Sequence, residues 1–455
     1  MVLLHISTSS PSAALVVAGG CFRRGILFKN ISASFSTSSH KPLRYAVLGA
    51  GFAGLSVTWH LLQHSPKENH VCIDIYDDVG IGGGASGVSG GLLHPYSPKV
   101  KPLWRSMECW KESLKLLSIA EAAVESNKLN AGSQESGHGS DDFVVRRRGI
   151  IRPAVSLKNL DLMKENAQNC LASCRVEFID KEAAERLVPD LCVPFNLAFY
   201  MPEAVNVHPQ RYLELHSLLL SLSTALYSAC QNLVKDVSVL GLHRKELNLH
   251  KKAVTNLLEL SGEYDSVIIC LGARAAFLPE LSERLPLRTC RGVIAQLQLP
   301  DDNRESYAEH GPSILSDAWI AIHGPHNVRL GSTWEWKSRN YSQDVAVEEA
   351  SKALEELLPK ASAIYPGIKN WKYITAKAGL RAMPPLTSHG SLPLLACIDE
   401  YLIGKQTCKF WLFTGLGSRG LLYHGWLGKL MAQAVVSCSE DVFPPELVAW
   451  KSRMK

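Results

Sequence analysis

The stretch Tyr45-Ala-Val-Leu-Gly-Ala-Gly-Phe-Ala-Gly-Leu-Ser-Val-Thr-Trp-His-Leu-Leu62 decides the fold class of this chain. A short apolar segment leads into Gly49-x-Gly51-x-x-Gly54, and an apolar pattern with helical period follows. Gly49 permits a tight turn, Gly51 lets the backbone approach a pyrophosphate, and Gly54 lets the helix pack close to the strand. The helix then offers unpaired N–H groups and its positive dipole end to the anion. The order predicts a dinucleotide-binding strand, turn and helix.

A second strand that ends in an acid supports this interpretation. The segment Val71-Cys-Ile-Asp-Ile-Tyr-Asp77 alternates apolar residues, and Asp77 stands 23 residues after Gly54. The ribose-binding carboxylate of such a unit belongs near this position. The alternative is that the glycines only close a turn and that Asp77 is a solvated strand end. The agreement of strand, glycines, helix, second strand and acid favours nucleotide binding.

Composition predicts an ordinary globular protein. The chain has 455 residues, of which 46% are hydrophobic and 20% charged, enough for two or more domains. No run of about 18 apolar residues occurs, so we expect no membrane span. The twelve cysteines are scattered, and the close pair Cys170 and Cys174 has no partner set at metal-ligand spacing. We therefore predict neither a metal site nor a disulfide framework.

The first 42 residues differ from the rest of the chain. They contain nine serines and four basic residues, and the first acid of the chain is Glu68. This composition is typical of an organelle transit peptide, and its hydroxyl content favours a chloroplast over a mitochondrion. The alternative is a disordered tail without an address. Because these residues carry most of the +5 net charge, the remainder is nearly neutral and gives no global reason to expect nucleic acid.

The remaining pattern predicts an α/β fold with a discontinuous nucleotide-binding domain. We expect a Rossmann-like domain with an inserted substrate domain built mostly on an antiparallel sheet. The pattern predicts a helix over 104–124, a polar loop over 125–142 and a strand-rich region around 245–260. It also predicts an amphipathic helix over 343–359 and a last helix that ends near 438. The predicted limits are 43–100, 206–285 and 376–440 for the first domain, 101–205 and 286–375 for the second, and 441–455 for a C-terminal tail.

Beyond residue 43 the chain resembles the D-amino-acid oxidase superfamily of FAD-dependent oxidoreductases, which includes glycine and sarcosine oxidases. The loop Gly82-Gly-Gly-Ala-Ser86-Gly-Val-Ser-Gly-Gly91-Leu-Leu-His-Pro95 resembles the second FAD motif of that family. The segment Ala378-Gly-Leu-Arg381 is similar to the family's Gly-Leu-Arg-Pro segment, and Gly415-Leu-Gly417-Ser418-Arg419-Gly420-Leu resembles its last motif. Asp236-Val237 resembles the strand whose valine backbone meets adenine.

The resemblance implies FAD as cofactor and a specific set of residues around it. Because the segment after Arg381 reads Ala-Met-Pro and contains no cysteine, we expect non-covalent FAD. The implied FAD-binding residues are Gly49, Gly51, Phe52, Ala53, Gly54, Asp77, Ala85, Ser86, Gly91, Leu92, Val237, Gly272, Gly417, Ser418, Arg419, Gly420 and Leu421.

The resemblance also implies oxidation of a carbon–nitrogen bond by hydride transfer to FAD. Arg381 is the candidate that binds a substrate carboxylate, since guanidinium suits a bidentate grip. The alternative is a structural arginine paired with a loop. His94 and Tyr423 are further catalytic candidates, as are Tyr96 and His424, although each could equally be a packing residue. The expected partners are a small amine or amino-acid substrate and oxygen or another electron acceptor.

Two short stretches, at 85–95 and 417–421, are closest in motif to the FAD oxidase domain of the bacterial enzyme that makes 5-methylaminomethyl-2-thiouridine in tRNA. This resemblance keeps open the oxidative removal of a carboxymethyl group from a tRNA wobble uridine. The same arginine fits a free N-substituted glycine and this nucleoside. A catalytically silent flavin-binding protein is a further alternative, and an NAD-dependent dehydrogenase would leave the later motifs unexplained.

Overall fold

The chain is built on two large sheets, and most residues of the predicted motifs line a cavity between them. The computed structural model describes residues 41–66, 68–130, 143–158, 160–213, 225–239, 244–299, 307, 310–324, 326–402 and 407–453. The part from Lys41 to Lys455 forms one compact unit, so the predicted domain limits stay predictions. The predicted transit segment lies almost wholly outside the described residues.

The first sheet carries the glycine turn. Its six strands within the described residues follow the order β19-β20-β10-β1-β2-β9, and only β19 is antiparallel to its neighbour. The doubly wound order places the carboxyl ends of β1, β10 and β20 side by side, where α/β sheets bind their ligands. The strands are β1 (Leu43–Leu48), β2 (Val71–Tyr76), β9 (Lys245–His250), β10 (Ser266–Ile269), β19 (Leu394–Cys397) and β20 (Lys409–Thr414).

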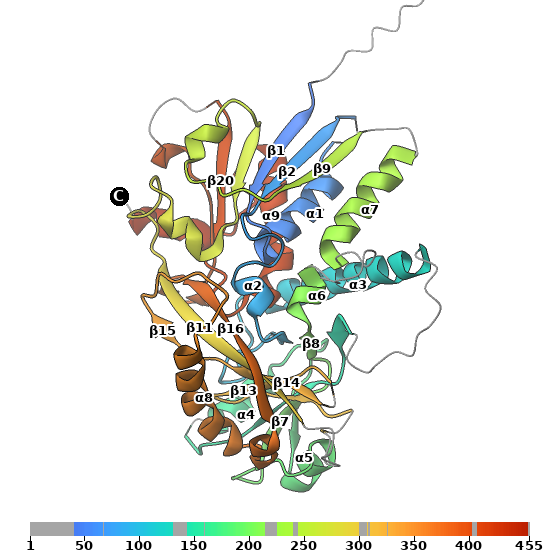
Figure 1. The fold of residues 1–455 in the computed structure, drawn as a ribbon, viewed down its shortest axis with the longest axis vertical. Coiled ribbons are helices and arrows are strands. Elements are labelled where there is room, and N and C mark those ends of the chain that lie inside the picture. Colours follow the sequence, from blue (N-terminus) through green and yellow to red (C-terminus); the bar gives the residue numbers. More distant parts are fainter. Residues whose placement is uncertain are drawn as a thin grey trace, which may run out of the picture. The chain divides into compact units, whose positions relative to one another are not determined.

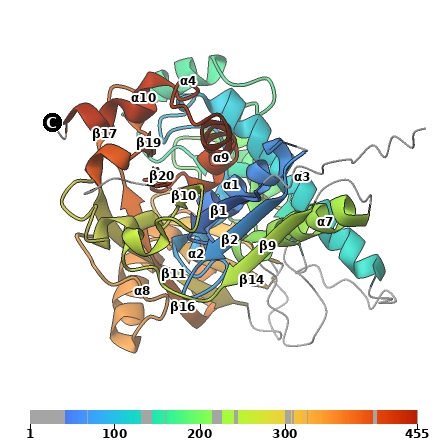
Figure 2. The ribbon, with the colours of Figure 1, turned by 90° about the horizontal axis from the view of Figure 1, so that it is seen from above.

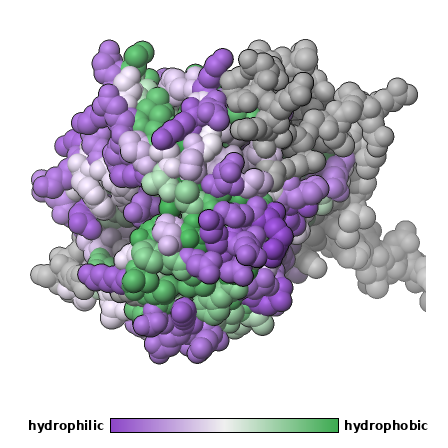
Figure 3. Space-filling view, turned by 90° about the horizontal axis from the view of Figure 1, so that it is seen from below, coloured by the Kyte–Doolittle hydropathy of each residue, from purple (hydrophilic) through white to green (hydrophobic). Residues whose placement is uncertain are grey.

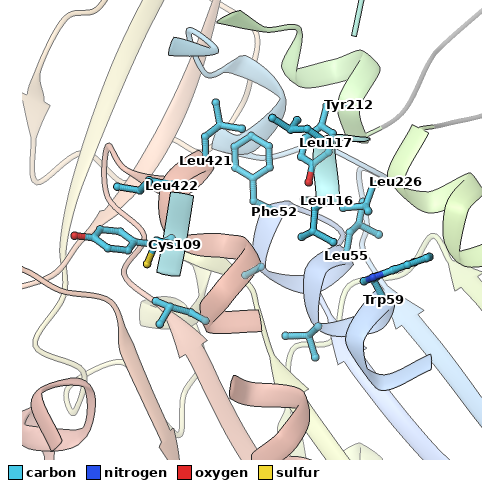
Figure 4. Packing of buried hydrophobic residues seen from close by; sticks show 14 of the residues in the cluster. Phe52, Leu55, Trp59, Cys109, Leu116, Leu117, Tyr212, Leu226, Leu421 and Leu422 are labelled. Carbon is cyan, nitrogen blue, oxygen red and sulfur yellow. The ribbon is translucent and has the colours of Figure 1, made fainter. Parts of the chain in front are cut away.

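Helices cover one face of this sheet, as Figures 1 and 2 show. They are α1 (Phe52–His64), α3 (Ser106–Asn130), α7 (Ala225–Val239) and α9 (Gly420–Ser437). Alternate strand residues such as Val47 and Ile73 pack against them in one buried cluster. Figure 4 shows Phe52 and Leu55 of α1 packed among side chains of the other helices. Burial of this apolar face stabilises the sheet that positions the glycine turn.

The second sheet occupies the lower half of Figure 1 and is mostly antiparallel. Its two longest strands are β11 (Arg288–Gln298) and β16 (Lys372–Met383), and their register sets Cys290 opposite Arg381. The amphipathic helix α8 (Val347–Ser362) packs on β11 and β14. The other strands are β5 (Ile150–Pro153), β6 (Glu177–Ile179), β7 (Ala198–Met201), β12 (Ser313–Ile314), β13 (Trp319–Ile322), β14 (Asn327–Gly331) and β15 (Glu335–Trp336).

Shorter elements connect the two sheets. In a small three-stranded sheet, β8 pairs with β3 on one side and with β4 on the other. The sheet thereby links β3, which follows the second glycine motif, to the segment that begins at Val205. These elements are α2 (Ala85–Val88), α4 (Leu160–Gln168), α5 (Lys181–Leu187), α6 (Pro209–Leu213), α10 (Pro445–Val448), β3 (Leu92–Leu93), β4 (Val145–Arg146), β8 (Val205–Val207), β17 (Leu386–Thr387), β18 (Gly390–Ser391), and the 3-10 turns η1 (Leu257–Leu260), η2 (Gly272–Phe277), η3 (Pro366–Asn370), η4 (Asp399–Tyr401) and η5 (Ala449–Arg453).

The structure corrects several local expectations. Val237 lies in α7 and not in a strand, because apolar residues at helical spacing continue the helix to Val239. The expected strand near 256 is the turn η1, and the helix expected to end at 124 continues to Asn130. The rest of the predicted loop, 131–142, lies outside the described residues. Residue 376, where a predicted domain limit lies, is inside β16, a strand of the second sheet, and the limit itself stays a prediction.

The predicted C-terminal tail is folded. Residues 445–453 form α10 and η5, and α10 packs on β19. The Trp450 side chain is buried, and its Nε1–H donates to the carbonyl of Leu395 at 3.3 Å. The segment therefore belongs to the core beside the first sheet.

Figure 3 views the end of the molecule opposite the first sheet and shows apolar residues gathered in the middle of a largely hydrophilic face. No helix in the described part of the chain combines the length and the apolar character that a membrane span requires. Within the same residues, no group of three or more His, Cys, Asp or Glu side chains could ligate a metal ion.

Candidate active site

A cavity of about 360 Å³ runs between the first sheet's carboxyl edge and strands β11 and β16 of the second sheet. Most residues that the sequence analysis singled out line it. They are Gly49, Gly51, Phe52, Ala53, Asp77, Ala85, Ser86, Gly91, Leu92, His94, Gly272, Arg381, Gly417, Ser418, Arg419, Gly420 and Leu421. Gly54 and Tyr423 are not among its lining residues.

The glycine turn at one end of the cavity has the geometry of a phosphate cradle. Gly49 has a φ of 103°, and a Cβ there would lie 2.5 Å from the carbonyl oxygen of Cys270. A Cβ on Gly54 would lie 1.8 Å from the carbonyl oxygen of Gly49, so this glycine sets how closely α1 packs on the turn. Helix α1 begins at Phe52, whose N–H donates to Ser86 Oγ at 3.1 Å. The first N–H groups of α1 thus face the cavity as an anion site.

Asp77 closes this cradle from the neighbouring strand. Its Oδ2 accepts the Ala50 N–H at 2.9 Å, and its Oδ1 accepts the N–H groups of Val79 and Gly80 at 3.1 and 3.0 Å. Burial raises the pKa of Asp77. His250, the last residue of β9, contacts Asp77: its carbonyl accepts the Asp77 N–H at 3.1 Å. The carboxyl end of β9 therefore lies beside Asp77.

A second helix terminus points at the cavity from the other side. Helix α9 begins at Gly420 without a side-chain cap, and Gly417 before it has a φ of 55°. Gly420 and Leu421 both line the cavity. Because uncapped N–H groups and the helix dipole favour negative charge, this terminus is suited to an anionic or electron-rich group.

Arg381 reaches the cavity from β16 and is held by neutral groups. Its Nη2–H donates to the Thr333 carbonyl at 2.6 Å, its Nη1–H to Ser332 Oγ at 3.2 Å, and its Cζ lies 4.0 Å above the ring of Trp334. Burial lowers the pKa of Arg381. Among the described residues no carboxylate forms an ion pair with it, and the guanidinium keeps an uncompensated charge.

The other catalytic candidates separate into two groups. His94 lines the cavity and is almost fully buried, with its Nε2 at 3.4 Å from Arg419 Nη1. Tyr423 is buried in the helical core next to Cys109 and does not reach the cavity. His424 is also a core residue, with its Nε2 at 2.7 Å from Tyr212 Oη. Tyr96 donates its hydroxyl to the Cys174 carbonyl, away from the cavity.

Strand pairing brings in residues that no motif singled out. Gly292 of β11 leaves the space that the Arg381 guanidinium fills, since a Cβ there would lie 2.3 Å from Nη2. Trp319 and Trp334 form walls of the cavity. Gln343 spans the two sheets by donating its Nε2–H groups to the carbonyls of Gly82 and Gly84 at 3.0 Å. These contacts depend on register between distant strands, and single residues in the sequence carry no local signal for them.

A family model described as DAO, FAD-dependent oxidoreductase, matches residues 44–434. The chain belongs to the DAO family of FAD-dependent oxidoreductases. It is therefore an FAD-dependent oxidoreductase, as the sequence analysis predicted, and the DAO-type α/β fold is confirmed.

Individual proteins similar to this DAO-family chain are distant. A Rhizobium etli protein, provisionally named as the thiamine biosynthesis oxidoreductase ThiO, is 24% identical over 355 residues, which cover 75% of this chain and 85% of that protein. Two crystal structures share the fold, each covering 89% of this chain and 98% of its own. Iminodiacetate oxidase from Chelativorans sp. BNC1 has 20% identity and a TM-score of 0.59. Glycine oxidase from Geobacillus kaustophilus has 17% identity and a TM-score of 0.60.

The cavity of this DAO-family enzyme fits FAD. Backbone N–H groups at the start of α1 would hold the pyrophosphate, and Asp77 lies where the adenosine ribose would follow. The Ala85–Ser86 segment and the α9 terminus line the rest of the cavity. Backbone N–H groups at the start of α1 and of α9 can thus donate hydrogen bonds from two sides of the cavity, which suits a flavin dinucleotide.

Proposed function

We propose that this enzyme oxidises the carbon–nitrogen bond of an amino acid or secondary amine of the glycine type, including N-substituted glycines. The observation that carries the proposal is the Arg381 guanidinium, which lines the cavity without an ionised partner among the described residues. A buried charge of this kind is costly unless a counter-charge joins it. A substrate carboxylate is the natural counter-charge.

Arg381 has the fixed geometry that carboxylate binding needs. Its contacts with Ser332 and Thr333 and its stacking on Trp334 hold the guanidinium plane in one orientation. A carboxylate held in a bidentate manner fixes the carbon next to it. The names of the two structural relatives, glycine oxidase and iminodiacetate oxidase, support a substrate with a carboxylate next to an amine carbon.

Bound FAD supplies the acceptor for the hydride that leaves this carbon. The residues of the chain bind and orient the substrate, exclude water with the apolar walls Leu315 and Trp319, and offer the α9 terminus to developing negative charge. The oxidised carbon–nitrogen bond is an imine, which water then hydrolyses. Two thiols nearby, Cys270 and Cys290, have their pKa raised by burial, which disfavours the thiolate and supports non-covalent FAD.

The proposal is tested by anaerobic absorbance titration of the FAD-loaded protein. Glycine, N-methylglycine, D-amino acids and simple amines are added in turn. We expect loss of the oxidised-flavin absorbance with at least one carboxylated amine. A flavin that none of the carboxylated amines reduces contradicts the proposal and favours a catalytically silent flavoprotein.

A second candidate function is oxidation of a carboxymethylaminomethyl uridine in tRNA. It is favoured by exposed aromatic rings beside the cavity: Trp334 and Tyr341 line it, Trp336 lies next to Trp334, and each is 45–50% exposed. Trp334 and Trp336 are stacked with ring centroids 5.9 Å apart, and Arg288 lies 4.9 Å above Trp336. Aromatic rings next to cations are suited to stacking bases beside phosphates.

The tRNA candidate makes a separate prediction about binding. A tRNA that carries the modified wobble uridine should bind with an affinity that falls with salt, and Trp336→Ala should weaken it while leaving oxidation of free amines unchanged. Equal binding by the wild type and Trp336→Ala contradicts this candidate. Action in a chloroplast, proposed from the first 42 residues, is tested by the location of a fusion of that segment to a fluorescent protein.

A further inference from the structure

A second cation lines the same cavity as Arg381. Arg419 precedes the first turn of α9, and its Nη1 lies 3.4 Å from His94 Nε2. Within the described residues no acid forms an ion pair with Arg419, and the one acid among the cavity's lining residues is Asp77 in the phosphate cradle. The cavity thus holds two guanidinium groups, Arg381 and Arg419, that lack a protein counter-charge.

His94 cannot supply the missing negative charge. The ring is 3% exposed, and its two nitrogens each lie near an N–H donor, with Nδ1 at 3.3 Å from Tyr96 N and Nε2 at 3.4 Å from Arg419 Nη1. A neutral imidazole has one acceptor nitrogen, so it accepts from one of these two donors and carries no charge in either tautomer. Burial, Arg419 and Arg152 all hold the pKa of His94 well below its ordinary value, so the ring stays neutral.

His94 therefore leaves the charge of Arg419 uncompensated. Arg152 on β5 adds positive charge nearby, since it contributes with burial to the lowered pKa of Arg419. An anionic oxygen beside Arg419 would accept from its N–H groups and neutralise the guanidinium.

We propose that the substrate carries two anionic groups, of which Arg381 binds the one next to the oxidised carbon and Arg419 binds the other. This inference rests on the proposed amine oxidation and narrows its substrate class. Glycine and N-methylglycine fill one of the two sites, whereas an N-carboxyalkyl glycine fills both. The second group is a carboxylate or a phosphate, because both present anionic oxygens to a guanidinium.

The experiment measures ligand binding and needs no turnover. Malonate, succinate and glutarate are each compared with the monocarboxylate of equal carbon number, namely propionate, butyrate and valerate, by their shift of the flavin absorbance spectrum in the FAD-loaded protein. Phosphonoacetate and 3-phosphonopropionate test phosphate as the second group. We expect at least one dianion to bind about tenfold or more tightly than its matched monoanion.

Two variants locate the sites. Arg419→Met should raise the Kd of the dianion by a larger factor than the Kd of the monocarboxylate, and Arg381→Met should weaken both ligand types. Arg147→Met is the matched control, because Arg147 pairs with Glu121 outside the cavity and its loss should change neither Kd. The phosphonates distinguish a phosphate from a carboxylate as the preferred second group.

Three results overturn the inference. Equal Kd values for every matched pair show that one anionic group is bound. An Arg419→Met variant that weakens monoanions and dianions by the same factor shows that Arg419 acts on the flavin instead. Monocarboxylate binding that depends on Arg381 preserves the proposed function in both cases, whereas absence of any carboxylate binding overturns the inference and the proposed function together.

Discussion

Gly292→Ala tests how the second sheet positions Arg381. The glycine lies on β11, and an added Cβ would lie 2.3 Å from Arg381 Nη2, 2.8 Å from its Cζ and 3.0 Å from the Thr333 carbonyl oxygen. The backbone of Gly292 lies outside the left-handed region, so alanine fits the local conformation. The substitution therefore acts on the space that the guanidinium occupies.

The magnitude follows from this geometry. An ordinary contact begins at 3.4 Å, so the guanidinium has to move by about 1 Å to restore one. A misplacement of about 1 Å in a positioning group can cost about 100-fold in rate, or about 2.7 kcal/mol. Because the far end of a flexible side chain can yield, we expect a loss of unfolding free energy at the low end of the about 1–3 kcal/mol typical of overpacking.

The assay compares kcat/KM for the reducing amine in the wild type, Gly292→Ala, Arg381→Met and the double variant. If Gly292 acts through Arg381, the double variant should be no less active than Arg381→Met alone. FAD affinity should stay at the wild-type value in all four proteins. A Gly292→Ala enzyme with wild-type kcat/KM, or a double variant in which both losses multiply, would refute this reasoning.

Three further predictions concern the fold that supports the site. Gly54→Ala places a Cβ 1.8 Å from the Gly49 carbonyl oxygen, and it should cost about 1–3 kcal/mol in urea unfolding and weaken FAD binding; an unchanged FAD affinity contradicts the cradle. Burial lowers the pKa of His60 from 6.5 to about 3. Between these two pH values His60 is therefore protonated in the unfolded chain and neutral in the folded chain. Stability should therefore fall by about 1.4 kcal/mol per pH unit as pH drops from about 6.5 toward 3, and His60→Leu should remove this share of the slope in unfolding measured at several pH values. Trp450→Ala should cost about 3–5 kcal/mol, because its ring is buried and bonded to Leu395; wild-type unfolding would show that residues 445–453 are dispensable.

Local chemistry made the cofactor end of the cavity predictable. The turn at Gly49 and Gly51 and the glycines before α9 carry their conformational requirement in single residues, and the structure sets them around one cavity. The place of Asp77 beside the glycine turn was predictable from its distance along the chain, because the second strand of a βαβ unit pairs in parallel with the first. The motif residues therefore lie where short-range rules place them.

The substrate end was predictable only in part. Arg381 stood out in the sequence through a family resemblance, but its contacts with Ser332 and Thr333 depend on the pairing of β11 with β14 and β16. Such register between distant strands has no signal in a single residue. Val237 was placed wrongly in a strand because that expectation rested on a two-residue resemblance, whereas the apolar residues before it have helical spacing and continue α7 to Val239.

The most direct test of the central claim compares amines that differ only in their carboxylate. Anaerobic stopped-flow absorbance follows flavin reduction by N-methylglycine and by dimethylamine, and by glycine and methylamine, in the wild type and in Arg381→Met. We predict that a carboxylated amine reduces the wild-type flavin and that its decarboxylated partner does not. Arg381→Met should lower the second-order rate constant of reduction by about 30- to 5,000-fold, the range for removing one partner of a buried charge pair. Equal reduction by both members of a pair, or an Arg381→Met enzyme that keeps the wild-type rate, would contradict the claim.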